Sequence, residues 1–380
     1  MTRVAMVIQR YLPHVGGAER QIQNLAPLLR SRGIEVLVLT RREKALPAYE
    51  IIDGTPVFRL PAPGPKLVAA ICFTISAVRL LRQLDVDLIH AHELLSPTSV
   101  AALGKLLYGP PIVAKVLRGG KFGDVHKIKR RSFGGLRIRL LRRMVDVFIA
   151  ISSEIQRELT DLGIPAERCV FIPNGVDVLR FRPALLEEKR RLRQIHQLPP
   201  EAPIAIYVGR LVREKRVEHL ISAWRTVRAA VPDALLLIVG SGSEESTLMN
   251  MAGPGVRLIG EVSDVAPYFQ CSDLFVLPSS SEGLSGALLE ALASGLPVVA
   301  TSVGGATDVI QHLENGYLIP PDDIAALEFA LRTLLCDSAL RARLGSSGRH
   351  RSASAFSFDL VADRLVDTYR GMLASSELKG

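Results

Sequence analysis

The chain has 380 residues, a mass of 41.4 kDa and 48% hydrophobic residues, enough apolar material for a large core and for two domains. This composition argues against a disordered or fibrous protein. The charge of +9 is unevenly shared, because residues 1–190 hold 30 Lys and Arg against 17 Asp and Glu, whereas the remainder holds 17 against 21. We therefore expect the two halves to bind different partners.

Short apolar runs alternate with helical patterns along the first half. We expect strands in RVAMVIQ, EVLVLT, DLIHAH, PIVAKVL and VDVFIAIS, and a helix in AERQIQNLAPLLRSRG that ends at Gly33. The apolar residues 67–81 carry Arg79 and are fewer than the ~20 that span a bilayer, which favours a core helix. The apolar run at the start of the chain is interpreted as a buried strand and not as a signal peptide.

Residues 126–143 are strongly basic. Eight Lys and Arg lie between Asp124 and Asp146 without an acid, interleaved with Ile, Leu, Phe and Met. The pattern favours a surface that lies on anionic lipid headgroups. A solvated basic helix is the alternative, and nucleic acid is a weaker third because only Phe133 could stack on a base. We expect an anionic membrane surface as a partner and no nucleic acid.

The second half repeats the alternation of strands and helices. Residues 171–183 are rich in Pro, Gly, Asn and Asp and are expected to join two domains. Strands follow in IAIYVG, ALLLIVG, VRLIG, LFVLPS and PVVAT, with a helix in VEHLISAWRTVRAAVP. Apolar strands separated by helices indicate parallel sheets covered on both faces. The predicted fold class is therefore α/β, with two doubly wound domains and a ligand cleft between their strand ends.

The stretch SSSEGLSGALLEALASG, residues 279–295, sets two glutamates around a strand–loop–helix junction. Glu282 lies in the loop, and Gly283, Leu284 and Ser285 lead onto the helix, whose unpaired backbone N–H groups favour an anion such as phosphate. Glu290 is expected about two turns into the helix, leaning back toward its N-terminus to accept hydrogen bonds from ligand hydroxyls. A solvated Glu282 and a Glu290 paired with a basic neighbour are the alternative.

Three further glycine-containing turns follow predicted strands. In YVGRLVREK, Arg210 and Lys215 come after a strand that ends at the same sheet edge, and two fixed cations suit a diphosphate. Gly16 and Gly17, between the first strand and its helix, permit close approach of a ligand, although this signal is weak alone. The last pair, Gly240 and Gly242, is typical of a tight turn.

In order and spacing, several segments of the chain resemble family 4 of the retaining glycosyltransferases. These segments are GGAER, IPNGVD, VGRL with EK, SEGLSGALLEALASGLPVVAT, and VGGATDVI with NGYLIPPDD. The resemblance covers nearly the whole chain. It implies the GT-B fold, with two Rossmann-like domains, a nucleotide-sugar donor held mainly by the second, and no metal requirement. It also implies that the last helix returns to the first domain, so we expect domains at 1–183 with 356–380 and at 184–355.

Carried over residue by residue, the resemblance implies roles at the donor site. Arg210 and Lys215 would hold the diphosphate of a UDP- or GDP-sugar, and Glu290 would accept the ribose hydroxyls. Glu282 would act as the catalytic residue beside the donor sugar. The remaining donor contacts would come from the backbones of Gly16, Gly17, Gly283, Leu284 and Ser285.

The chain departs from the family after the PIVAKV strand. Where many members carry His-Gly or His-Asp, it has Leu117 and Arg118. This segment is similar to a variant of the family motif, in which a Lys is followed by a Gly-rich turn and Gly-Asp. The acceptor-side candidates are therefore Lys115, Arg118, Asp124 and His126, although His126 is also typical of a solvated loop.

We therefore expect a cytoplasmic glycosyltransferase of the retaining, metal-independent, hexosyltransferase type, without a cofactor, peripheral on the inner face of a membrane. Its acceptor would be the hydroxyl of a saccharide, either lipid-linked or part of an envelope or exported polysaccharide. A nucleotide-sugar epimerase or hydrolase and a non-catalytic nucleotide-sugar-binding partner are the alternatives. The four cysteines show no metal-ligand spacing and are expected to be reduced, mostly buried thiols.

Overall fold

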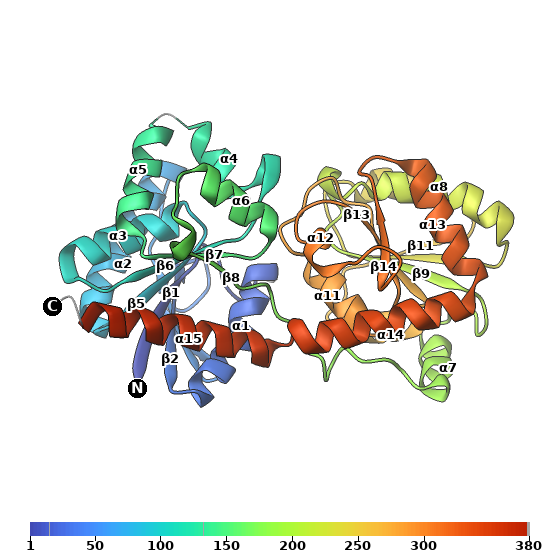
Figure 1. The fold of residues 1–380 in the computed structure, drawn as a ribbon, viewed down its shortest axis with the longest axis horizontal. Coiled ribbons are helices and arrows are strands. Elements are labelled where there is room, and N and C mark those ends of the chain that lie inside the picture. Colours follow the sequence, from blue (N-terminus) through green and yellow to red (C-terminus); the bar gives the residue numbers. More distant parts are fainter. Residues whose placement is uncertain (15, 132, 378–380) are drawn as a thin grey trace. The chain divides into compact units, whose positions relative to one another are not determined.

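The computed structural model describes residues 1–14, 16–131 and 133–377, and its helices and strands are drawn in Figure 1. Contacts divide the chain into two compact units. Unit 1 comprises Met1–Asn174 and Phe358–Gly380, and unit 2 comprises Gly175–Ser357. The last helix, α15 (Phe358–Glu377), therefore packs with the first part of the chain.

Unit 1 is built on an eight-stranded sheet of order β3-β4-β2-β1-β5-β6-β7-β8, parallel except for the β3–β4 pair. The five predicted strands are confirmed, and three strands were not predicted. The edge hairpin of β3 and β4 is half-exposed and lacks a continuous apolar run, while β8 has only three residues. The strands are β1 (Thr2–Val7), β2 (Ile34–Arg41), β3 (Tyr49–Ile52), β4 (Thr55–Leu60), β5 (Leu88–His92), β6 (Ile112–Val116), β7 (Val147–Ala150) and β8 (Cys169–Phe171).

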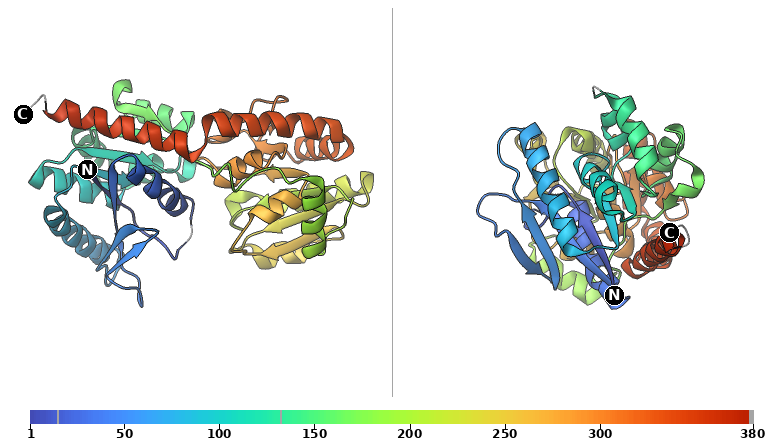
Figure 2. Two further views of the ribbon diagram at one scale, coloured as in Figure 1. Left: turned by 90° about the horizontal axis from the view of Figure 1, so that it is seen from below. Right: turned by 90° about the vertical axis from the view of Figure 1, so that its left-hand side faces the viewer.

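Helices cover both faces of this sheet, as Figures 1 and 2 show. On one face α1 (Gly17–Ser31) and α15 pack on β1 and β5 through residues such as Ile22 and Leu365. On the other face, α3 (Ser96–Tyr108) lies close enough that a Cβ on Gly104 would touch Ile89. Helix α1 ends at Ser31, and Gly33 has the left-handed φ of 87° predicted for a residue that terminates a helix.

Helix α2 (Lys66–Leu84) is only half a core helix. Residues such as Phe73 and Leu81 are buried, and the helix packs along α3. The opposite side exposes Leu67, Val68, Ile71 and Ile75. By length and composition α2 is the one helix in the described residues that could cross a membrane. Only 28% of its most apolar 18-residue stretch is buried in the structure. The expectation of a core helix therefore holds for one face only.

Unit 2 contains a fully parallel sheet of order β11-β10-β9-β12-β13-β14. Its five predicted strands are confirmed, and the short edge strand β14 was not predicted. The strands are β9 (Ile204–Val208), β10 (Leu235–Val239), β11 (Val256–Gly260), β12 (Leu274–Leu277), β13 (Val298–Thr301) and β14 (Gly316–Ile319). The helices include α7 (Leu186–Ile195), α8 (Val217–Ala230), α9 (Glu245–Met251), α10 (Ala266–Cys271), α11 (Gly286–Ala293), α12 (Ala306–Val309), α13 (Ile324–Cys336) and α14 (Ser338–Ala355).

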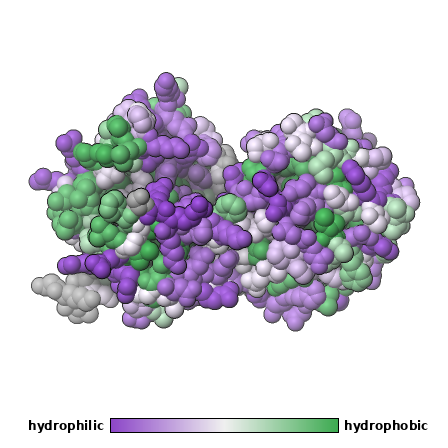
Figure 3. Space-filling model, turned by 90° about the horizontal axis from the view of Figure 1, so that it is seen from above, coloured by the Kyte–Doolittle hydropathy of each residue, from purple (hydrophilic) through white to green (hydrophobic). Residues whose placement is uncertain are grey.

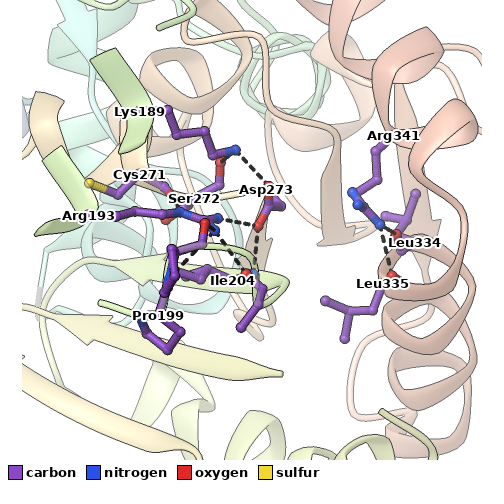
Figure 4. Close-up of polar contacts among 12 residues, drawn as sticks. Lys189, Arg193, Pro199, Ile204, Cys271, Ser272, Asp273, Leu334, Leu335 and Arg341 are labelled. Atoms are coloured by element: carbon purple, nitrogen blue, oxygen red, sulfur yellow. Dashed lines mark hydrogen bonds and ion pairs between the residues drawn. The ribbon is translucent and has the colours of Figure 1, made fainter. Parts of the chain in front are cut away.

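A partly buried ion cluster attaches α7 to this sheet (Figure 4). Asp273, directly before β12, accepts a hydrogen bond from Lys189 Nζ at 2.6 Å and one from Arg193 Nη2 at 2.7 Å, both on α7. The same carboxylate accepts from the Ile204 backbone N–H at 2.7 Å. Because every oxygen of Asp273 has a partner, its burial is compensated, and the segment that enters unit 2 is fixed to its first strand.

The four cysteines are free thiols. Cys169 and Cys271 are buried as expected, and Cys72 is half-buried. The expectation of burial is wrong for Cys336, because it is the last residue of α13 and its side chain is exposed there.

Candidate functional site

The loop between β12 and α11 brings the predicted catalytic residue to the carboxyl edge of unit 2. Residues 279–284 are nearly all buried, and Ser285 caps α11 by accepting a hydrogen bond from the Leu288 N–H at 3.3 Å. The first N–H groups of α11 therefore lie directly after the loop, where the helix dipole favours an anion.

Glu282 is held in a buried polar network. Its side chain is 8% exposed, and Oε1 accepts a hydrogen bond from Lys215 Nζ at 2.5 Å and another from Ser279 Oγ at 2.7 Å. The Ser279 carbonyl in turn accepts from Thr301 Oγ1 at 2.5 Å. The structure thus brings Glu282 and Lys215 into direct contact, which no sequence pattern predicted.

The turn at Gly304 packs against the backbone of this loop. Gly304 has φ = 54°, and a Cβ at this position would lie 2.4 Å from the carbonyl oxygen of Glu282. The next residue, Gly305, donates its N–H to the Gly283 carbonyl at 2.6 Å. Only a glycine fits this combination of backbone conformation and close approach. The VGG segment therefore packs directly against the backbone of the Glu282 loop and fixes its position.

Glu290 is half-buried and is the fifth residue of α11. The helix begins at Gly286, as predicted, so Glu290 lies four residues, or just over one turn, from its start, and the expectation of two turns is wrong. Gly283 and Leu284 lie between the two glutamates, in the buried loop before the Ser285 cap.

Arg210 lies on the loop after β9, beside β12 in the sheet. Its side chain is 69% exposed and its nearest acidic partner is Glu214, at 3.8 Å. The glycines after β10 explain how this loop is held: a Cβ at Gly240 would lie 2.0 Å from the Gly209 carbonyl oxygen. Gly240 is therefore required for more than a tight turn, because the loop that carries Arg210 packs directly against its backbone.

In unit 1, Gly16 is the N-cap of α1 and Gly17 is its first residue. Among the described residues, a Cβ at Gly17 would meet no atom within 4 Å, whereas one at Gly16 would lie 2.4 Å from a carboxylate oxygen of Glu19. Space is therefore available above Gly17 at the start of the helix.

Lys115 is the penultimate residue of β6 and is buried next to the histidines of β5. Its partner in the register is His92, and burial lowers the pKa of Lys115 to about 8. His90 and His92 stack with ring centroids 4.4 Å apart, and His90 Nδ1 lies 2.6 Å from the Tyr369 hydroxyl of α15. Burial lowers the pKa of His90 to about 3, so both the pKa and the contacts favour a structural role for this residue.

Asp124, the first residue of α4 (Asp124–Lys129), is buried and accepts a hydrogen bond from the Leu94 N–H at 3.3 Å. Burial raises its pKa. Arg118 and His126 are half-buried, and Arg118 lies over the Phe122 ring at 5.4 Å. The structure therefore gathers these acceptor-side candidates around the carboxyl ends of β5 and β6.

Glu93 belongs to this group and was missed. It follows β5 directly with a left-handed φ of 92° and accepts a hydrogen bond from Gln9 Nε2 at 2.5 Å. Burial and the nearby Asp124 raise its pKa to about 7. The signal in the sequence was its position immediately after a predicted strand, the same criterion that selected Arg210.

Within the described residues, no group of three or more His, Cys, Asp or Glu side chains is arranged to hold a metal ion. The loops after β9 and β12, with the start of α11, instead carry two cations, Arg210 and Lys215, two carboxylates, Glu282 and Glu290, and a helix N-terminus. This set is suited to a ligand that combines phosphate groups with hydroxyl groups.

The chain matches two family models. The one described as "Glycosyltransferase Family 4" matches residues 15–180, and the one described as "Glycosyl transferases group 1" matches residues 188–351. The chain is 30% identical over 391 residues to a GDP-mannose-dependent alpha-mannosyltransferase of Mycolicibacterium smegmatis, with 99% of each protein covered. It is 33% identical over 322 residues to a putative teichuronic acid biosynthesis glycosyltransferase of Bacillus subtilis, covering 79% of this chain and 77% of that protein.

Solved structures share the fold. Sucrose-phosphate synthase from Thermosynechococcus elongatus superposes with a TM-score of 0.84 at 24% identity, covering 99% of this chain and 100% of the other. Anabaena HepE in complex with UDP-glucose superposes with a TM-score of 0.82 at 20% identity, covering 98% and 100%. The predicted α/β fold with two Rossmann-like domains, shared with GT-B glycosyltransferases, is confirmed.

Proposed function

The chain belongs to glycosyltransferase family 4, and on this basis we propose that it moves a hexose from a nucleotide diphosphate-sugar to a hydroxyl acceptor, with retention and without a metal. Membership of the family supports a sugar transferase. The donor is supported by the relative that uses GDP-mannose and by the structural neighbour that binds UDP-glucose. We take the donor to be a UDP- or GDP-sugar.

The observation that carries the proposal is the polar group at the carboxyl edge of β9 and β12. Arg210 is exposed there. Lys215 and Ser279 both donate hydrogen bonds to Glu282, which lies in the loop directly before α11. Arg210 and Lys215 would bind the diphosphate, and the Lys215 ammonium has three donors, of which one serves Glu282. Glu290 would accept the ribose hydroxyls. The loop backbone at Gly283, Leu284 and Ser285 would complete the donor contacts.

In the reaction, the bond between the sugar anomeric carbon and the diphosphate oxygen breaks, and its electron pair passes to the diphosphate. A new bond forms from the acceptor oxygen to the anomeric carbon on the same face, and the acceptor proton passes to an oxygen of the departing diphosphate. Arg210, Lys215 and the α11 N-terminus would stabilise the charge that develops on the diphosphate. Glu282, held by two hydrogen bonds, would support the positive charge on the sugar ring and is not assigned as a covalent nucleophile.

The acceptor is proposed to be a saccharide at a membrane surface, either lipid-linked or part of an exported polysaccharide. The basic segment 126–143 exposes most of its cations on α4 and α5 (Gly134–Met144), and α2 of the same unit exposes a row of large apolar side chains. Cations beside apolar groups are typical of a surface that lies on anionic lipid. We therefore propose a cytoplasmic enzyme, peripheral on the inner face, with Lys115, Arg118, Asp124 and His126 on the acceptor side.

The test is a transfer assay with UDP- and GDP-hexoses and a lipid extract as the acceptor, in buffer with EDTA. We expect sugar to enter an organic-soluble product from one donor, with the anomeric configuration of the donor kept in its NMR spectrum. Product without acceptor would favour the hydrolase or epimerase, and donor binding without any product would favour the non-catalytic partner. An inverted product, or dependence on added metal, would contradict the proposed mechanism.

A further inference from the structure

A small apolar cavity lies on unit 1 at the contact between α3 and α5. Its volume is about 240 Å³, and its walls are mainly apolar side chains: Ala102, Phe133, Leu136, Leu140, Leu141 and Met144. It is smaller than the pockets of roughly 300–1,000 Å³ that hold whole drug-sized ligands. A space of this size suits a single narrow apolar group.

The rim of this cavity exposes large apolar side chains to water. Phe133 is 82% exposed, Leu136 is 64% exposed and Leu140 is 49% exposed. Figure 3 shows hydrophobic patches on the same body, separated by strongly hydrophilic groups. Exposed apolar groups that surround an apolar hollow mark a surface that is covered in use.

Cations without ion-pair partners in the described residues lie on α5, the helix that forms one wall of the cavity. Arg139, Arg142 and Arg143 are exposed on α5, and none of them forms an ion pair within the described part of the chain. Arg137 lines the cavity and binds neutral groups only, donating to the Leu95 carbonyl at 2.5 Å and to Ser99 Oγ at 3.0 Å. An occupant that carries negative charge beside its apolar group would therefore complement the charge of α5.

We propose that this cavity binds the acyl chain of an anionic lipid, with the headgroup phosphate on the arginines of α5. A second copy of the chain would be repelled, because a symmetric dimer places this basic surface against itself. The exposed apolar side chains of α2 form a second apolar surface on the same unit. A bilayer could cover both surfaces at once, whereas a single bound peptide would not. The inference rests on the membrane surface of the proposed function and adds a specific lipid site to it.

The experiment is calorimetric titration of the full chain with decanoyl lysophosphatidylglycerol below its micelle concentration. We expect saturation at one lipid per chain. Decanoyl lysophosphatidylcholine is expected to bind at least tenfold more weakly, and glycerol 3-phosphate, which has no acyl chain, not to bind. Equal affinity for all three probes, or no saturation, would overturn the proposal.

Two variants test the two parts of the site. Ala102→Trp fills the cavity and is expected to weaken lipid binding at least tenfold, whereas Ala325→Trp, on an exposed turn of α13, is the matched control. The double variant Arg139→Gln and Arg143→Gln is expected to lose roughly fivefold for each arginine removed. Wild-type affinity in either variant would overturn the proposal, so the test still holds if the other variant folds poorly.

Nucleotide titration and light scattering separate the remaining outcomes. If UDP or GDP binds but the lipid does not, the lipid site is wrong and the proposed function stands. Lipid binding without nucleotide binding would instead contradict the proposed function and leave the lipid site supported. A dimer that dissociates on Phe133→Asp would show that the chain covers its own apolar surface, against the proposal.

Discussion

Lys215 Nζ lies 2.5 Å from Glu282 Oε1, and the two side chains are 14% and 8% exposed. The residues are 67 positions apart, and they meet because β9 and β12 are neighbours in the sheet. A buried pair of this kind holds a carboxylate in one orientation and leaves two ammonium N–H groups for other acceptors. The predictions for unit 2 begin from this contact.

Removing one partner of this pair should cost more than removing both charges. Lys215→Met leaves Glu282 buried without a cation and is expected to destabilise unit 2 by about 3 kcal/mol. The double variant Lys215→Met with Glu282→Gln should recover most of this loss. Denaturant unfolding followed by Trp224 fluorescence measures it, because this residue is the only tryptophan and is buried in the core of unit 2.

The control is Arg190→Met, since Arg190 pairs with Glu187 at the surface with 49% and 85% of the side chains exposed. Its effect should stay below about 1 kcal/mol. A double variant that is no more stable than Lys215→Met alone would contradict this account of the pair.

Ser279 is predicted to position Glu282 without contacting the donor. It is fully buried, and its hydroxyl donates to Glu282 Oε1 at 2.7 Å. Ser279→Ala should lower kcat about tenfold with little change in KM, because a hydrogen bond to a charged group contributes about 1.5–3 kcal/mol. Ser222→Ala on α8, which removes a hydroxyl bonded within its own helix, is the control. A change confined to KM would argue against a positioning role.

Gly17 offers a test that separates function from stability. The added methyl group of Gly17→Ala meets no atom of the described residues within 4 Å and lies at the first residue of α1, so stability should be unchanged or slightly raised. Sugar transfer should nevertheless fall, because a methyl group occupies space that we assign to the donor. Gly135→Ala, also at the start of a helix with open space around it, should alter neither property. Full transfer activity in Gly17→Ala would remove Gly17 from the donor site.

The stability of unit 1 should depend on pH through Glu93. The pKa of this carboxyl is raised from 4.5 to about 7 in the folded chain, chiefly by burial, so the folded state binds a proton that the unfolded state releases. Its contribution is therefore fully present below pH 4.5 and is lost as the pH rises through 7. Glu93→Gln, which stays neutral, should raise the melting temperature over wild type at pH 8 and bring little gain at pH 5. An equal gain at both values would show that the charge of Glu93 is not the cause.

The sequence predicted the parts of the site that depend on strand ends. Arg210 and Glu282 each follow a strong apolar strand, and parallel strands bring their carboxyl ends to one edge, so their general location followed from the pattern. The direct contacts could not be predicted. Ser279, Glu282 and Lys215 meet only once the order of strands in the sheet is known, and His90 reaches Tyr369 across 279 residues.

Two local features were missed for other reasons. In the hairpin at the edge of the sheet, β3 alternates exposed with half-buried residues and β4 alternates buried with half-buried residues, so the hairpin lacks the continuous apolar run that identified the buried strands. Glu93 was passed over because its left-handed backbone and its burial next to Asp124 are visible only in the folded chain.

The most direct test of the donor site is calorimetric titration of the wild type, Glu290→Ala and Glu328→Ala with UDP, GDP and ADP. The last variant removes a glutamate that pairs with Arg332 on the same helix, α13, and serves as the control. We expect one nucleotide to bind the wild type and the control equally and to bind Glu290→Ala at least tenfold more weakly, a loss of about 1.4 kcal/mol. If no nucleotide binds, or if Glu290→Ala binds like the wild type, the assignment of the donor site to α11 is contradicted.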